Sequence, residues 1–285
     1  MIGKARLMAA VALGASLAAP ASGQALDRIR KQGAVTLGYI DGASPFSFVD
    51  AKGEPQGYSV DLCRAVAEGL KRQLKRSDLK LRWVKLTIQN RLDAVRRRRV
   101  DVECSTTTWT LGRQALVDFS LITFVDGASI LAKAGTDVSH LSDFTGKRVA
   151  VITGTTTEKV LRDALAQRSI KAEVVPIKTR DEGLALLNEG KVEGLASDRI
   201  TLIGVVARSA KGGSVYKLLD EDFSVEPYAL ALPRGDYELR LAVNRVLARL
   251  YRSGEIRPIY DRWLGPLGPP SLMLSASYFI QGLSE

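Results

Sequence analysis

The amino-acid sequence predicts an α/β protein with mainly parallel sheets flanked by helices. Short apolar segments rich in β-branched residues alternate with longer segments whose apolar residues recur every three or four positions. This alternation occurs twice, in residues 34–104 and in residues 148–196, so the chain contains two similar halves. Of its 285 residues, 46% are hydrophobic and 25% charged, the composition of an ordinary globular protein.

The first half predicts three strands and two helices. In chain order they are a strand at 34–39, a helix at 60–74, a strand at 79–86, a helix at 89–98 and a strand at 100–104. The first of these helices is amphipathic, because it carries an apolar residue at every fourth position: Leu62, Val66, Leu70 and Leu74.

The second half repeats this order and leads into a C-terminal region. It predicts a strand at 148–152, a helix at 158–166, a strand at 173–177, a helix at 180–188 and a strand at 192–196. A strand at 228–232 and a long helix at 237–253 follow, and the helix is expected to turn five residues inward: Leu241, Val243, Val246, Leu247 and Leu250. Ligands bind beyond the carboxyl ends of parallel strands, which favours the loops at 41–46, 105–113 and 154–157.

The N-terminus has the pattern of a secretory signal peptide. Two basic residues precede an apolar run at 7–19, which is too short to span about 30 Å of hydrocarbon. Three small residues are candidates for the last signal residue: Ala21, Gly23 and Ala25. We take residues 1–25 as the signal and expect a periplasmic protein, not lipid-anchored because no cysteine lies near the cleavage site.

The chain is basic, with 41 Lys and Arg residues, 31 Asp and Glu residues and a formal charge of +10. Removal of Lys4 and Arg6 with the signal leaves +8. The densest basic run, residues 96–99, follows an expected helix, where cations oppose the negative end of the helix dipole. No aromatic residues interleave with it, as stacking on single-stranded nucleic acid requires. A nucleic-acid partner is therefore not expected.

Two cysteines, Cys63 and Cys104, would meet an oxidising compartment after export. They are compatible with a disulfide and equally with two separate buried thiols, each packed as a small hydrophobic residue. The sequence leaves both alternatives open.

Short motifs in a fixed order run through almost the whole chain after the signal. They are Gly38 with residues 45–48, residues 57–62, Asn90-Arg91, residues 100–104, residues 106–108 with Arg113, Phe119-Ser120, residues 141–147, residues 154–156 with Glu158, residues 194–198, and residues 254–256 with Trp263. Together they resemble the bacterial extracellular solute-binding proteins of family 3, the polar amino-acid-binding proteins of ABC importers. Within this family the chain is most similar to the glutamate/aspartate-binding branch.

The resemblance implies a type II periplasmic binding protein fold, with two lobes joined by two crossing strands at 129–131 and 228–230. The first lobe is expected to contain residues 26–131 and 227–285, and the second residues 132–226. Hinge closure then traps the ligand. The implied partners are a small amino acid and the membrane permease of an ABC importer, and the binding protein is expected to be a monomer.

An amino acid presents a carboxylate and an ammonium group at a fixed separation, so its receptor needs a fork of donors and an anion. Arg113 supplies the fork, and the hydroxyls of Thr106 and Thr108 match the family motif that donates to the same carboxylate. Thr155 and Thr156 lie just before an expected helix, whose free N–H groups and dipole favour an anion.

The resemblance also assigns the other end of the ligand. Asp198 matches the ammonium-binding carboxylate of the far lobe, and Arg91 matches a contact to the distal carboxylate of acidic ligands. Arg180 stands where a histidine is usual and keeps a cation there. Ile40 and Gly112 depart from the acidic branch, where a basic and an acidic residue are common. The expected ligand is an acidic or other polar amino acid, and glutamine or asparagine stays open.

Two other classes of function compete with a binding protein. The first is an enzyme on the same fold that resembles cyclohexadienyl or arogenate dehydratases, with Glu103 as a candidate buried acid. The one histidine, His140, lies in a surface-type segment, so no Ser-His-Asp triad or histidine-based metal site is expected. The loop at Gly154 lacks the Gly-Lys-Ser/Thr of a phosphate-binding loop, and no cofactor is indicated. The second class, a nucleic-acid binder, depends on net charge alone.

Overall fold

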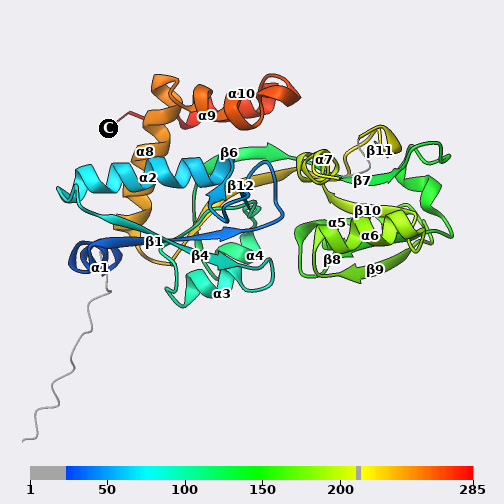
Figure 1. Cartoon of the computed structure of the whole chain (residues 1–285), viewed down its shortest axis with the longest axis horizontal. Coiled ribbons are helices and arrows are strands. Elements are labelled where there is room, and N and C mark those ends of the chain that lie inside the picture. The colour runs from blue at the N-terminus through cyan, green and yellow to red at the C-terminus, as the bar shows by residue number, and fades with distance from the viewer. Residues whose placement is uncertain (1–23, 210–212, 285) are drawn as a thin grey trace, which may run out of the picture.

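The computed structural model describes residues 24–209 and 213–284, so the expected signal up to residue 23 lies outside the described residues. The described residues form two α/β lobes connected by two long neighbouring strands, β6 (Asp118–Asp126) and β12 (Glu226–Leu232) (Figure 1). Each lobe contains a five-stranded sheet with helices against it. The predicted α/β class with two lobes is confirmed.

The first lobe contains a mixed sheet with strand order β4-β1-β5-β12-β6. Strand β1 (Ala34–Ile40) pairs in parallel with β4 (Lys80–Leu86) and β5 (Val102–Glu103), whereas β12 is antiparallel to β5 and β6. A small hairpin joins β2 (Phe48–Val49) to β3 (Pro55–Gln56). The helices of this lobe are α1 (Gln24–Gln32), α2 (Tyr58–Leu74), α3 (Arg91–Arg96), α4 (Leu111–Gln114), α8 (Tyr237–Ser253), α9 (Ile256–Trp263), the 3-10 turn η3 (Gly265–Leu267) and α10 (Leu272–Gln281).

The second lobe also contains a mixed sheet, with strand order β11-β7-β10-β8-β9. Strand β8 (Arg148–Ile152) is parallel to β9 (Glu173–Ile177) and β10 (Gly194–Asp198). Strand β7 (Ala128–Lys133) is antiparallel to β10 and to β11 (Tyr216–Leu218). Its helices are α5 (Thr156–Gln167), α6 (Arg180–Glu189), α7 (Arg199–Ala207) and the 3-10 turns η1 (Leu141–Phe144) and η2 (Gly213–Val215).

The chain changes from the first sheet to the second at Gly127, between β6 and β7. Residues 128–131, which the sequence predicts in the first lobe, pair instead with β10 of the second sheet. The chain turns at Gly127 in a confined space, where an added Cβ would lie 2.6 Å from the carboxylate of Asp222. On the return path the first sheet resumes at Glu226, one residue earlier than predicted.

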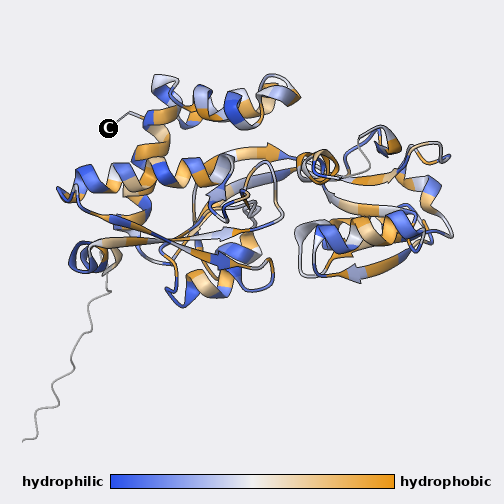
Figure 2. Cartoon of the chain, viewed as in Figure 1, coloured by the Kyte–Doolittle hydropathy of each residue, from blue (hydrophilic) through white to orange (hydrophobic). Residues whose placement is uncertain are grey.

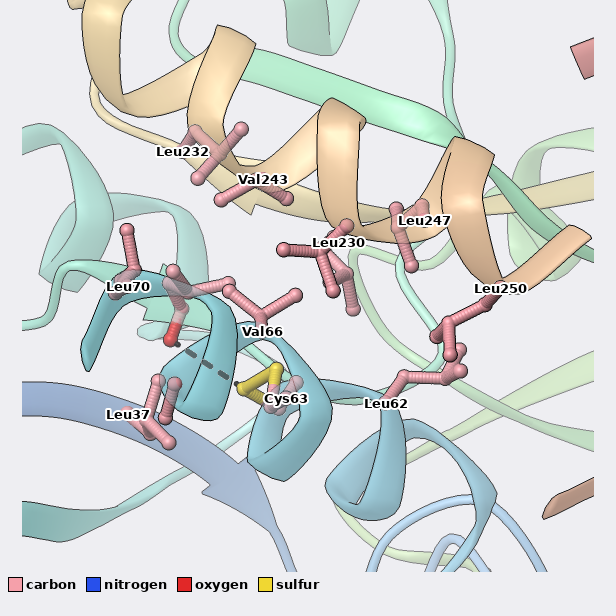
Figure 3. Packing of buried hydrophobic residues seen from close by; sticks show 14 of the residues in the cluster. Leu37, Leu62, Cys63, Val66, Leu70, Leu230, Leu232, Val243, Leu247 and Leu250 are labelled. Carbon is pink, nitrogen blue, oxygen red and sulfur yellow. Dashed lines mark hydrogen bonds between the residues drawn. A yellow bond between two sulfur atoms is a disulfide. The ribbon is translucent and has the colours of Figure 1, made fainter. Parts of the chain in front are cut away.

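The core of the first lobe lies between its sheet and the helices α2 and α8, with the predicted apolar stripe of α2 inside it (Figure 3). Both sheets are mostly hydrophobic, whereas the outer helices carry hydrophilic residues (Figure 2). Four of the five residues predicted inward on α8 are buried: Val243, Val246, Leu247 and Leu250. The prediction is wrong for Leu241, which is 45% exposed, because it lies about 200° around the helix from Val243.

Cys63 on α2 and Cys104 at the end of β5 are joined by a disulfide, with an S–S distance of 2.10 Å (Figure 3). Both cysteines are fully buried in the core of the first lobe. Of the two alternatives left open by the sequence, the structure contains the disulfide. It fixes the end of β5, from which the loop at 105–110 leaves the sheet.

The expected signal boundary after Ala25 falls inside α1. Ala25 is fully buried, and its backbone N–H donates to Asp236 Oδ2 at 3.0 Å. Asp236 also caps α8, because its Oδ1 accepts a hydrogen bond from the backbone N–H of Leu239 at 3.2 Å. The residues at 24 and 25 are therefore part of the folded first lobe.

The basic run at 96–99 lies at the end of α3, as predicted. Arg96 and Arg97 both pair with Asp93 and are more than half exposed. Arg98 differs, since it adopts a left-handed backbone with φ of 55° and approaches the buried Asp236 to 3.8 Å. Across residues 24–209 and 213–284, no helix has the length and hydropathy needed to cross a bilayer.

Candidate functional site

A small cavity lies between the lobes, where loops at the carboxyl ends of strands from both sheets meet. Its volume is about 10 Å³, which is room for roughly one water molecule. Seven of the eight predicted site residues line it: Arg91, Thr106, Thr108, Thr155, Thr156, Arg180 and Asp198. The eighth, Arg113, lies beside it and donates from Nη1 to the carbonyl oxygen of Thr108 at 3.0 Å. The structure thus brings all eight residues together.

The loop that carries Thr106 and Thr108 is held at both ends. Before it stands the disulfide at Cys104, and after it Trp109 donates its backbone N–H to the carbonyl oxygen of Pro227 at 2.7 Å. Both threonine side chains are buried. The hydroxyls of this loop are therefore presented from a rigid support next to β12.

Arg91 and Arg180 bring two buried guanidinium groups to the cavity, with exposed fractions of 4% and 7%. Arg180, the first residue of α6, donates from Nε to Ser197 Oγ at 2.9 Å and to Thr201 Oγ1 at 3.1 Å. Burial lowers the pKa of Arg91, the Glu103 carboxylate opposes this shift, and the charge of Arg180 adds to it. Two buried guanidinium groups on one cavity wall have the chemistry that pairs with a carboxylate.

Arg113, on the short helix α4, lies on the first-lobe side of the cavity. Burial and the nearby charge of Arg91 lower the pKa of its guanidinium to about 10, whereas the carboxylate of Glu226 opposes this shift. The group is therefore charged at neutral pH. Its position next to Thr108 gives the cavity a third cation.

Asp198 ends β10 and presents a buried carboxylate from the second lobe. Its Oδ1 accepts from Thr157 Oγ1 at 2.8 Å, and its Oδ2 accepts from the hydroxyl of Tyr228 at 2.5 Å. The same hydroxyl lies 3.3 Å from Asp126 Oδ2. Burial and the charge of Asp198 raise the pKa of Asp126 well above its usual range, which favours its neutral form. Of these two carboxyl groups, Asp198 is the one that lines the cavity.

The hydroxyl of Thr155 is committed to its own segment of the chain. Its hydroxyl caps α5 by accepting from the backbone N–H of Glu158 at 3.0 Å, and it donates its proton to the carbonyl oxygen of Ile152 at 2.7 Å. The proton of this hydroxyl is therefore already donated within the protein. The hydroxyl of Thr156 instead donates to Glu226 Oε2 at 2.8 Å.

Two further residues of the site, Glu226 and Tyr228, were not predicted from the sequence, because β12 was expected only as a crossing segment. Both are almost fully buried, and both reach residues of the cavity wall. A signal was present: the two polar side chains flank Pro227, so they lie on the same face of a strand.

Two residues considered for other chemistry do not line the cavity, Glu103 and His140. Both carboxylate oxygens of Glu103 accept hydrogen bonds from hydroxyls, those of Ser105 and Thr107. His140 is exposed at the start of η1. Within the described residues, no group of His, Cys, Asp or Glu side chains is arranged to hold a metal ion.

The chain is similar to known proteins of one family. Residues 35–266 match the bacterial extracellular solute-binding proteins, family 3. The L-glutamate/L-aspartate-binding protein of Pseudomonas aeruginosa is 32% identical over 252 residues, which cover 88% of this chain and 83% of that protein.

Two solved structures share the fold at similar identity. An ancestral arginine-binding protein bound to arginine has 27% identity and a TM-score of 0.73, over 82% of this chain and 99% of that one. An ancestral amino acid-binding protein that is a precursor of cyclohexadienyl dehydratase has 26% identity and a TM-score of 0.70, over 84% of this chain and 98% of that one. The chain therefore belongs to the bacterial extracellular solute-binding proteins of family 3.

Proposed function

We propose that this protein captures a polar amino acid, preferably glutamate or aspartate, between its lobes and delivers it to the permease of an ABC importer. The observation that carries this proposal is the meeting of three guanidinium groups and the Asp198 carboxylate around one interlobe cavity. An acidic amino acid has two carboxylates and one ammonium group, and this set of residues offers a partner to each. The glutamate/aspartate-binding relative supports the same ligand class.

The proposed contacts follow the positions of the groups. Arg113, with Thr106 and Thr108, holds the α-carboxylate, and Asp198 accepts from the ammonium group. Arg91 and Arg180 hold the side-chain carboxylate, which an amide ligand satisfies less well because it carries no charge. The cavity of about 10 Å³ is smaller than any amino acid, so entry requires the lobes to separate about the segments at Gly127 and Glu226.

We also propose that the protein is exported to the periplasm and is a monomer. The buried disulfide supports export, because such bonds persist in oxidising compartments. Cleavage after Ala25 would remove the bond from its N–H to Asp236, so we move the proposed boundary from Ala25 to Gly23. The mass of the exported protein tests this choice, with Gln24 expected as the first residue.

A thermal-shift screen of the twenty amino acids tests the binding function. A ligand at 100 times its dissociation constant stabilises the folded state by about 2.7 kcal/mol. Glutamate and aspartate are expected to raise the melting temperature most, and Arg113→Ala is expected to abolish every shift. Shifts that persist in Arg113→Ala would contradict the assignment of the α-carboxylate.

The enzyme alternative is favoured by one comparison, the likeness to a precursor of cyclohexadienyl dehydratase. That solved structure is itself described as amino acid-binding, and Glu103 is held by two hydroxyls away from the cavity wall. We therefore propose a binding protein without catalytic activity. Incubation with prephenate and arogenate decides the matter, because turnover of either compound would overturn this proposal.

A further inference from the structure

Glu226 is a buried carboxylate to which the contacts proposed above give no role. It begins β12 and is 2% exposed. Its Oε2 accepts from Thr108 Oγ1 at 2.7 Å and from Thr156 Oγ1 at 2.8 Å, and its Oε1 accepts from Ser224 Oγ at 2.8 Å. Thr108 belongs to the first lobe and Thr156 to the second, so one carboxylate oxygen joins both lobes. We call Glu226, Thr108 and Thr156 the interlobe clasp.

The clasp uses one donor that the proposed contacts give to the ligand, the hydroxyl of Thr108. A threonine hydroxyl has a single proton, so a hydroxyl that donates to Glu226 keeps only lone pairs for any other partner. The two hydroxyl oxygens lie 3.2 Å apart, and Glu226 Oε2 lies within hydrogen-bond distance of both. A ligand carboxylate that accepts from Thr108 requires the proton that Thr108 donates to Glu226. Glu226 and the ligand carboxylate therefore exclude each other at the Thr108 hydroxyl.

The charges around the clasp agree with this competition. The Glu226 carboxylate interacts with the guanidinium of Arg113 and opposes the lowering of its pKa by burial. A carboxylate of the ligand would take the place of Glu226 beside this cation. A ligand with two carboxylates brings one more negative charge into the same buried space than an amide does, and like charges repel strongly where water is excluded.

We infer that Glu226 is an internal competitor for the carboxylate of the ligand, which holds the lobes together through Thr108 and Thr156 until a ligand displaces it. The competition with a ligand carboxylate rests on the function proposed above, whereas the contacts of the clasp do not depend on it. Two consequences follow. First, the apparent affinity for the ligand is the intrinsic affinity multiplied by the fraction of molecules in which the clasp is open. Second, Glu226 disfavours acidic ligands more than amides.

The test compares Glu226→Ala, the isosteric Glu226→Gln and the control Glu238→Gln, which removes a charge from the exposed start of α8. Isothermal titration calorimetry measures binding of glutamate and glutamine, and small-angle X-ray scattering measures the radius of gyration without added amino acid. We expect Glu226→Ala to bind glutamate about tenfold more tightly than the wild type, with a smaller gain for glutamine. We also expect the radius of gyration of Glu226→Ala to be larger than that of the wild type. Glu226→Gln is expected to have an intermediate value, and Glu238→Gln the value of the wild type.

Two results would overturn the inference. If both Glu226 variants bind glutamate more weakly than the wild type, Glu226 contributes to ligand binding and does not compete with it. In that case, an equal loss of affinity for glutamine but none for glutarate identifies Glu226 as a partner of the ammonium group. An unchanged radius of gyration with unchanged affinity means that the clasp has no effect. If no amino acid binds to any variant, the proposed function fails, and the scattering comparison still decides the clasp. Far-UV circular dichroism confirms folding, and Glu226→Gln decides the question if Glu226→Ala does not fold.

Discussion

Gly204 on α7 of the second lobe lies directly against the carbonyl oxygen of Ser44 in the first lobe. A Cβ added at Gly204 would lie 2.0 Å from that oxygen and 2.6 Å from its carbon. The obstacle is backbone, which cannot move aside as a flexible side chain does. The contact therefore limits how closely the two lobes approach each other.

Gly204→Ala is expected to weaken ligand binding by about tenfold or more, because the added methyl group keeps the lobes from closing fully. The helix itself gains from the change, since alanine is favoured over glycine in a helix by about 1 kcal/mol. Calorimetric titration with glutamate measures the affinity. Gly265→Ala is the control, because its nearest contact is an ordinary 3.6 Å. Unchanged affinity in Gly204→Ala would show that closure does not depend on this contact.

Arg91→Ala is expected to weaken binding of glutamate and aspartate by between about tenfold and 100-fold, since a charge-assisted hydrogen bond contributes roughly 1.5–3 kcal/mol. Glutamine is expected to lose less, because its side chain is uncharged. Dissociation constants for the three ligands provide the measurement, with Arg82→Ala as a control on the exposed face of β4. An equal loss for all three would remove Arg91 from its role in selecting acidic side chains.

Tyr228→Phe is expected to weaken amino-acid binding by about tenfold, because Asp198 loses the donor that holds its Oδ2. The ring stays in contact with Phe46 and Phe124, so the core is conserved. Glutarate, which lacks the ammonium group, distinguishes positioning of Asp198 from a general defect. Its binding should be the same in wild type and variant. If glutarate and glutamate weaken together, Tyr228 does not act through Asp198.

Replacement of both cysteines by serine is expected to lower the free energy of unfolding by about 2–5 kcal/mol, the range typical for loss of a native disulfide. The bond closes a segment of 41 residues and supports the loop that carries Thr106 and Thr108. Urea unfolding of the wild type with and without a reducing agent, beside the double variant, measures the loss. A wild type whose stability is unaffected by reduction would contradict this expectation.

Local sequence pattern predicted much of the fold. Strands β8 and β9 and helix α8 have the predicted bounds, because each combines a clear apolar period with turn residues on either side. Helix α7 was not predicted, since its run of β-branched residues at 199–207 suits a strand by local preference. Its place at the junction of the lobes, where Ile200 packs against the core of the first lobe, supports the helix instead.

The predicted site residues came from motif resemblance, which identifies side chains that a family uses for its ligand. It did not indicate which of those side chains already have partners. Thr155 is committed to a helix cap, and Thr108 and Thr156 donate to Glu226. Such commitments depend on the direction of single protons and cannot be read from residue type or spacing.

Composition and periodicity were thus sufficient for the fold class, because they depend on near neighbours along the chain, and the order of the motifs was sufficient for the family. Long-range packing settled the disulfide, the change of sheet at Gly127 and the partners of each hydroxyl. Thr108 and Glu226 meet across 118 residues of sequence, and Thr156 and Glu226 across 70. Contacts at that separation form only once the chain has folded, and the contact to Thr156 also requires the two lobes to come together, which is why no local pattern records them.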